Sequence, residues 1–315
     1  MTDIVRIDLL DPAQRSRAQA WLDVHTAAER HLYGAAASVW GLAEILEFHR
    51  QPDTRRVSWA AIEDGVIVGA AEIVEGLRDN LDSARIWISV LPARRNRGIG
   101  AALVETVESA GRRDGRRIFH TFTGAPPGQE DPSRSFAEKR GYAASQTELR
   151  STLSLPLDAD RLTALGETAE PGGDPTAYRI ESHEGMPPDE WLPGLALLNR
   201  RMSTDAPMGG LDLEEEDWDE ERVRRRERAA LDAGRRVQTS VARETGSGRL
   251  VGFTQVASSA ETPSLAYQGA TLVLRDHRGH RLGMRLKAAN ALPSRRACPR
   301  SARCGPGTPR RTSRC

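Results

Sequence analysis

Residues 90–103 of this 315-residue chain read VLPARRNRGIGAAL, and residues 273–286 read VLRDHRGHRLGMRL. A valine, two leucines, an arginine and a glycine recur in register in the two stretches. The register also holds upstream, where Val68-Gly69 corresponds to Val251-Gly252. A repeat that keeps its register over this length predicts that the chain contains the same folding unit twice.

Each copy predicts a strand, a tight basic loop and a helix, in that order. Residues 85–91 (RIWISVL) are rich in β-branched and aromatic residues, which is typical of a strand. From Gly100 onward, apolar residues recur at helical spacing. Unpaired N–H groups at a helix start favour anions, and glycines let phosphate oxygens approach the backbone. The loop therefore predicts either a site for a phosphorylated small molecule or an ordinary turn with solvated arginines.

The loop Arg95-Asn96-Arg97-Gly98-Ile99-Gly100 resembles the R/Q-x-x-G-x-G/A pyrophosphate loop of the GCN5-related N-acetyltransferase (GNAT) family. Residues 136–142 (FAEKRGY) resemble the last helix of that family, and residues 118–122 lie between as its fifth strand. The second copy resembles one half of the tandem acetyltransferases of the mycothiol synthase kind. The resemblance implies an α/β fold with two tandem GNAT-like domains, each a mostly antiparallel mixed sheet flanked by helices.

The predicted organisation has four parts. An N-terminal GNAT-like domain covers residues 1–156, a linker covers 157–177, an incomplete second domain covers 178–290, and a tail covers 291–315. In the first domain we expect a helix that opens at Asp11-Pro12, a helix over 39–49, a hairpin of 57–62 with 66–74, and a closing strand over 149–156. In the second we expect strands over 178–182, 236–243, 250–257 and 266–274, a helix over 189–201, and a long charged helix over 214–233 with a solvated face.

The tail differs in composition from the rest of the chain. It holds seven arginines, four prolines, all three cysteines and no acidic residue. A shifted reading frame or truncation, a disordered arm that binds nucleic acid, and a metal site at Cys298 and Cys304 are the three interpretations. The first is favoured, because Pro293 stops the helix that starts at Gly283 before a fifth strand can follow. We therefore expect a disordered tail.

Charge and hydrophobicity argue against a membrane protein, a secreted protein and a nucleic-acid-binding protein. The formal net charge is only +1, and no run approaches the ~20 apolar residues of a membrane span. The N-terminus lacks the basic and then apolar build of a secretory signal. We expect a cytoplasmic protein with no membrane partner and no role for nucleic acid, and the oligomeric state stays open.

The resemblance implies that acetyl-CoA binds as co-substrate and that no metal takes part. In the first copy the implied coenzyme-binding residues are Ser89, Val90, Leu91, Arg95, Asn96, Arg97, Gly98, Ile99, Gly100 and Ala101. In the second copy they are Leu272, Val273, Leu274, Arg278, Gly279, His280, Arg281, Leu282, Gly283 and Met284. The second loop departs from the pattern at Arg281, which stands where the first has Gly98. A side chain there either crowds a phosphate or pairs with it.

The family resemblance implies direct transfer of an acetyl group to an amine of a small molecule or a protein. Such a transfer needs a base for the ammonium and an acid for the leaving thiolate. Glu72 and His120 are the candidate bases. The alternatives are a surface position in the hairpin for Glu72 and a packed or solvated strand position for His120. Ala137 stands where the family often has its tyrosine acid, and Tyr142 takes the family's aromatic core position.

Two classes of function follow. The first is an active acetyl-CoA-dependent N-acetyltransferase. The second is a sensor that binds the coenzyme without transferring its acetyl group. Ala137, Arg281 and the tail favour some loss of activity, whereas the intact first loop favours coenzyme binding.

Overall fold

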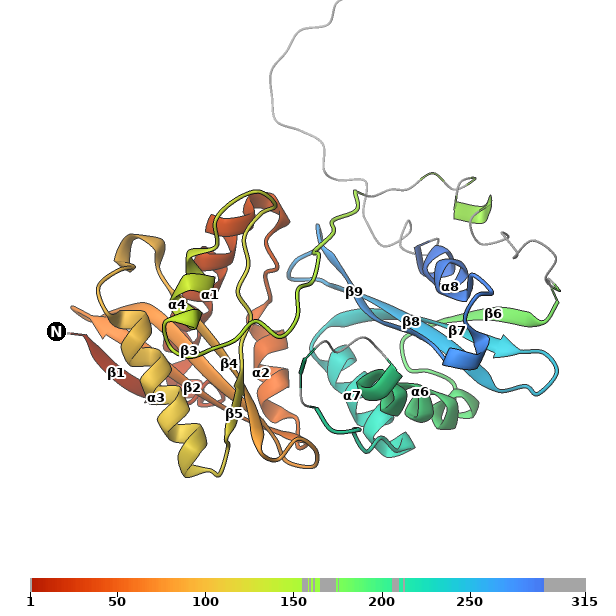
Figure 1. Ribbon diagram of the computed structural model, residues 1–315, viewed down its shortest axis with the longest axis horizontal. Coiled ribbons are helices and arrows are strands. Elements are labelled where there is room, and N and C mark those ends of the chain that lie inside the picture. Colours follow the sequence, from red (N-terminus) through yellow and green to blue (C-terminus); the bar gives the residue numbers. More distant parts are fainter. Residues whose placement is uncertain are drawn as a thin grey trace, which may run out of the picture.

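The computed structural model describes residues 2–154, 158, 160, 162–164, 174, 176–205, 210–211 and 213–291. Two β-sheets, each flanked by helices, lie side by side (Figure 1). Most of the predicted linker and all of the tail beyond residue 291 fall outside the described residues. None of the described helices combines the length and the apolar character that a membrane crossing needs.

The first sheet has the strand order β1-β2-β3-β4-β5. The strands are β1 (Asp3–Ile7), β2 (Thr54–Glu63), β3 (Val66–Gly76), β4 (Ser83–Val90) and β5 (Ile118–His120). Neighbours run antiparallel except β4 and β5, which run parallel. The hairpin predicted for residues 57–62 and 66–74 and the strand predicted for 85–91 are confirmed, and they form an antiparallel meander. The sequence pattern does not predict β1, and the closing strand predicted at 149–156 is wrong for residues 149–154, which are irregular.

Helices cover both faces of the first sheet. On one face, α1 (Arg15–Tyr33) and α2 (Leu42–Arg50) pack on β2 and β3 through a buried apolar cluster that includes Trp21, Leu46 and Ala70. On the other face, α3 (Ile99–Arg113) packs on β3 and β4. The short helix α4 (Pro132–Glu138) follows β5. Asp11 caps the turn before α1 by accepting from the Ala13 amide, as its sequence predicts.

The second sheet repeats this plan with the strand order β6-β7-β8-β9. The strands are β6 (Tyr178–Glu184), β7 (Arg235–Glu244), β8 (Leu250–Ser259) and β9 (Ala266–Val273), all antiparallel. One face carries α6 (Leu192–Asp205) and α7 (Glu220–Asp232), and the other carries α8 (Leu282–Ala291). Within the described residues β9 is the last strand, so this sheet has no counterpart of β5.

The repeated glycine stands in both sheets where a side chain would collide with a packed neighbour. A Cβ atom on Gly69 would lie 2.9 Å from a methyl group of Leu103 in α3. A Cβ atom on Gly252 would lie 3.4 Å from a methyl group of Leu286 in α8 and 2.9 Å from the Leu272 carbonyl oxygen. A larger residue at Gly69 would therefore push α3 away, whereas one at Gly252 would collide first with the backbone of β9. This explains why the repeat extends upstream of the loop.

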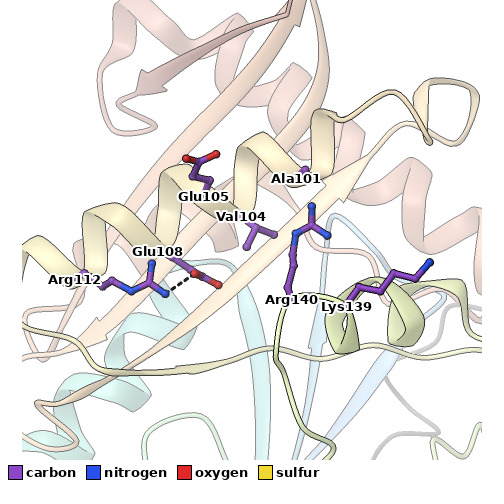
Figure 2. A pocket seen from close by; sticks show the side chains of 7 residues that line it. All are labelled: Ala101, Val104, Glu105, Glu108, Arg112, Lys139 and Arg140. Atoms are coloured by element: carbon purple, nitrogen blue, oxygen red, sulfur yellow. Dashed lines mark hydrogen bonds and ion pairs between the residues drawn. The ribbon is translucent and has the colours of Figure 1, made fainter.

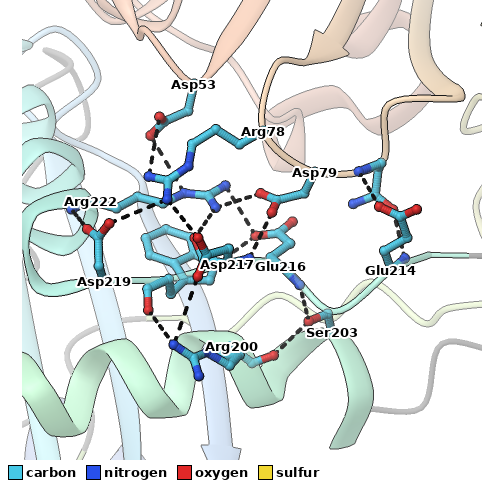
Figure 3. Close-up of polar contacts among 12 residues, drawn as sticks. Asp53, Arg78, Asp79, Arg200, Ser203, Glu214, Glu216, Asp217, Asp219 and Arg222 are labelled. Atoms are coloured by element: carbon cyan, nitrogen blue, oxygen red, sulfur yellow. Dashed lines mark hydrogen bonds and ion pairs between the residues drawn. The ribbon is translucent and has the colours of Figure 1, made fainter.

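Helix α7 is not the solvated helix that its charges predict. It begins at Glu220, where Asp219 caps it by accepting from the Arg222 amide, and Arg222, Val223 and Glu227 are buried. The Arg222 guanidinium lies 2.6 Å from the Asp79 carboxylate of the first domain. Arg78 pairs with Asp217 across the same boundary (Figure 3). Arg225 of α7 pairs with Asp53 there as well. The charges of α7 therefore join the two domains.

The segment between α1 and α2 is also fixed by the second domain. The Trp40 ring stacks on Tyr267 at 4.9 Å between centroids and 4° between planes. The Tyr267 hydroxyl donates to the Val39 carbonyl oxygen at 2.6 Å. Arg235 lies over the Trp40 ring and pairs with the buried Glu44 of α2. One end of β9 thus holds the connection between the two helices.

Candidate active site

The loop between β4 and α3 presents backbone N–H groups that the helix does not use. Asn96 and Gly98 have positive φ angles of 62° and 83°. The first helical amide to reach a backbone carbonyl is that of Ala102, which donates to Gly98 at 3.1 Å. The amides before it have no partner within the helix, as at any helix start. This end of α3 is therefore suited to bind an anion.

The carboxyl end of β4 has an unpaired edge on its β5 side, because β5 ends before it reaches that part of β4. β5 pairs with β4 only at Ser83 to Arg85, and Thr121 Oγ1 donates to the Ile86 carbonyl at 3.1 Å. Leu91 donates to Val68 of β3 at 2.9 Å. Since hydrogen-bonding directions alternate along a strand, Ser89 also faces β3, and Val90 faces the open edge. Of the three backbone positions predicted to meet the coenzyme, only Val90 presents its N–H there.

The three arginines of the first loop have different surroundings. Arg95 Nε donates to the Val90 carbonyl at 3.3 Å, and Arg94 pairs with Glu63 at the end of β2 at 3.2 Å. Arg97 is exposed and has no polar contact with any other described residue. Arg97 is therefore the arginine that is free to meet an anion at the start of α3.

A cavity of about 400 Å³ lies between α3 and the end of α4 (Figure 2). Its lining residues are Ala101, Val104, Glu105, Glu108, Arg112, Lys139 and Arg140. It begins at Ala101, next to the unpaired amides. Tyr142 donates at 2.6 Å to Glu108, one of the lining residues, and its burial and this hydrogen bond raise the Tyr142 pKa. Tyr142 is thus a packing residue, as its family position implies.

Glu72 is not the surface residue that the hairpin pattern suggests. It is 5% exposed in the middle of β3, on the face covered by α1 and α2. His49 of α2 and Arg56 of β2 each lie 2.7 Å from its carboxylate. Although burial opposes ionisation, the His49 hydrogen bond and the Arg56 charge hold the Glu72 pKa below its usual value. A carboxylate held in this way is a weak base.

His25, a residue that the motifs do not single out, contacts the end of β4. Its Nδ1 lies 2.8 Å from Ser89 Oγ, and its ring meets Trp21 edge-on at 4.4 Å. Its Nε2 is shielded from solvent and has no hydrogen-bond partner among the described residues. The helical spacing of Trp21 and His25 places both on the buried face of α1, and this spacing is the signal by which His25 can be found.

His120 and two aromatic rings complete this face. His120 is half-buried and lies opposite Arg85 in the parallel register. Trp87, two residues before Ser89, is 44% exposed, and Phe122 is 62% exposed. Their ring centroids are 5.8 Å apart. The side chains of His120 and Ser89, both named from the sequence, therefore lie on one face of β4 and β5, and His25, which was not, contacts that face from α1.

Burial of His25 predicts that acid destabilises the protein. Desolvation lowers the His25 pKa to about 4, and the nearby Glu72 charge offsets this only in part. Between pH 6.5 and 4 the unfolded chain binds a proton that the folded chain excludes, so stability falls as pH falls through this window. At about 1.4 kcal/mol per pH unit the loss is about 3 kcal/mol. Urea unfolding at several pH values should show a smaller loss for His25→Gln. Equal losses in the two proteins would contradict the assignment.

The second loop has the backbone of the first. Its positive φ angles occur at Gly279 (90°) and Arg281 (54°), the positions that match Asn96 and Gly98. Arg278 Nε donates to the Val273 carbonyl at 3.1 Å, as Arg95 does to Val90. Leu274 donates to Val251 at 2.9 Å, so Val273 alone faces the open edge.

The surroundings of the second loop are different. Leu272 and Leu282 are buried in the core, whereas Met284 is 47% exposed. His280 lies against Tyr178 at 5.2 Å between centroids. Arg281 is exposed in a left-handed conformation that costs a side chain about 1–2 kcal/mol. The described part of this domain also has no counterpart of α4, so the side of the cavity that Lys139 and Arg140 line in the first domain is not repeated.

Comparisons with known proteins agree with this geometry. The model of the acetyltransferase (GNAT) family matches residues 19–142. A tandem GNAT protein from the clavulanic acid biosynthesis pathway, solved without acetyl-CoA, is 25% identical, with a TM-score of 0.69 over 94% of this chain and 87% of that one. A GCN5-related N-acetyltransferase from Sphaerobacter thermophilus is 17% identical, with a TM-score of 0.59 over 97% and 89% of the two chains. No curated protein matches the chain.

Proposed function

We propose, because this chain belongs to the GNAT family of acetyltransferases, that its first domain transfers an acetyl group from acetyl-CoA directly to an amine. The observation that carries the proposal is the set of unpaired amides at the start of α3, next to the open edge of β4. The amides from Asn96 to Ala101 would hold the pyrophosphate, since the Arg95 amide donates to the Pro92 carbonyl, and Arg97 would add a positive charge.

The cavity between α3 and α4 supports a place for the rest of the coenzyme. It adjoins the amides at Ala101 and carries Lys139 and Arg140 on its α4 side. Cations on that wall suit the phosphate groups of coenzyme A. The acyl end would lie in the other direction, where the Val90 N–H faces the open edge.

The residues of β4 and β5 supply the groups that the transfer needs. The Val90 N–H would hold the thioester carbonyl and stabilise the negative charge that develops on its oxygen. Since His49 and Arg56 engage Glu72, we favour His120 as the group that takes the amine proton. His120 lies opposite Arg85, five residues along β4 from Val90, which is about 16 Å at about 3.3 Å per residue. It would therefore act through a chain of water molecules. The thiolate would then take its proton from solvent, because Ala137 and Tyr142 provide no acid here.

The experiment measures binding and turnover on the full chain. We expect calorimetry to show one equivalent of acetyl-CoA, because the second loop carries Arg281 and lacks a wall. Free thiol is then followed with a primary alkylamine, an aminoglycoside, an amino-acid amide and a lysine peptide as acceptors. Thiol release with at least one amine supports the transferase. Binding without release would identify the sensor instead, and absence of binding would overturn both.

A further inference from the structure

The Ser89 side chain has surroundings that the coenzyme site does not explain. Its backbone is used by the ladder with β3, and its hydroxyl lies 2.8 Å from His25 Nδ1. The side chain is on the α1 face of β4, one residue before the amide that would hold the thioester. The inference that follows rests on the proposed function.

The two faces of β4 differ in the side chains that they present near its carboxyl end. On the α3 side, Ile86, Ile88 and Val90 pack into the apolar cluster with α3. On the α1 side, Trp87 is 44% exposed and Ser89 is half-buried, so solvent reaches this face. An amine that attacks a carbonyl held at the edge must approach it from above or below its plane. Because Ile86, Ile88 and Val90 offer an amine no polar partner on the α3 side, the approach that provides a hydrogen bond passes Ser89.

We propose that Ser89 Oγ accepts a hydrogen bond from the attacking amine and that His25 is the positioning residue that makes this possible. When the ring hydrogen is on Nε2, Nδ1 accepts the Ser89 hydroxyl hydrogen. The oxygen lone pairs of Ser89 then face the amine. This directs the nitrogen lone pair of the amine toward the carbonyl carbon, which is a gain in orientation.

The charged groups around His25 fit this role. Glu72 is the carboxylate within electrostatic range of the ring, and His49 and Arg56 already satisfy it. Burial lowers the His25 pKa to about 4, so the ring is neutral at neutral pH. A protonated ring would donate to Ser89, turn its hydroxyl toward the substrate as a donor, and repel a cationic acceptor.

The first test is kinetic and uses the panel amine with the fastest turnover. Ser89→Ala should lower kcat/KM for that amine by about 10- to 100-fold. This is the range for losing a hydrogen bond to a group that carries or develops a charge. Its Kd for acetyl-CoA should stay unchanged. Ser89→Thr, which keeps the hydroxyl, should stay near wild type. Ser83→Ala is the matched control, because Ser83 is a buried β4 serine whose hydroxyl donates to the Asn80 carbonyl, at the other end of the strand.

The second test reads the tautomer without turnover. Nitrogen NMR of the imidazole should show His25 neutral at pH 7, with hydrogen on Nε2 and none on Nδ1. A hydrogen on Nδ1 would overturn this proposal but leave the proposed transferase standing. A Ser89→Ala variant with kinetics within twofold of wild type would do the same. A loss of acetyl-CoA affinity in Ser89→Ala would assign the hydroxyl to the coenzyme and also overturn it. Wild-type protein that binds acetyl-CoA but releases no thiol would instead overturn the transferase, and this inference with it.

Discussion

Gly98→Glu lowers the affinity for acetyl-CoA by about 100-fold or more, while the protein stays folded. Gly98 precedes α3 with a φ of 83°, beside the unpaired amides, and a Cβ atom there meets no atom within 4 Å. The new side chain therefore fits sterically. Its carboxylate would lie against the coenzyme pyrophosphate, and like charges placed together cost several kcal/mol. Calorimetric titration with acetyl-CoA measures the loss.

Gly115→Glu is the matched control for this substitution. Gly115 is exposed at the other end of α3, has a φ of 84° and is also open at its Cβ position. Both variants carry the same added charge and a similar backbone strain of about 1–2 kcal/mol. Only the variant at Gly98 should lose coenzyme. Unchanged affinity in Gly98→Glu, or an equal loss in the control, would contradict coenzyme binding by the first loop.

Arg222→Ala destabilises the protein by about 3–5 kcal/mol, because it leaves a buried carboxylate without its partner. The Arg222 and Asp79 side chains are 11% and 10% exposed. Arg222 also donates to the Asp217 carbonyl at 2.7 Å and lies over the Trp218 ring. Urea denaturation followed by tryptophan fluorescence measures the loss. Replacing Arg222 and Asp79 together by apolar residues should restore part of it.

Arg224→Ala is the control on the same helix. Its guanidinium pairs with Asp189 at 3.2 Å, but the two side chains are 45% and 87% exposed. Exposed pairs contribute about 0–1 kcal/mol, so the change in unfolding free energy should be small. If the two alanine variants were equally stable, the domain boundary would not depend on the buried pair.

The elements predicted correctly from the sequence are those with local signals. The hairpin turn, the alternating strands and the repeated loop each depend on residues close in the chain. The solvated face predicted for α7 is wrong because the partner of Arg222 is Asp79, 143 residues away. No spacing within α7 indicates that carboxylate. The five-residue strand β1 (DIVRI) is too short for a clear period and forms because β2 offers an edge to pair with.

The candidate site divides in the same way. The loop was predictable because glycines and arginines at fixed spacing have a direct backbone consequence, and both copies show it as positive φ at matching positions. The face of the sheet that carries Glu72 and Ser89 was not predictable, because it is assembled from α1, α2, β3 and β4. Glu72 meets His49, and Ser89 meets His25, only after helices from earlier in the chain cover the sheet.

The charged boundary at α7 has a genetic consequence. A duplicated half that need not perform chemistry is usually free to accumulate substitutions, but here its helix completes the charge balance of its neighbour. Variants at Arg222 or Tyr267 would therefore appear as loss-of-function alleles although they lie outside the reaction centre. Selection on the second half would then act on helix charge and ring stacking.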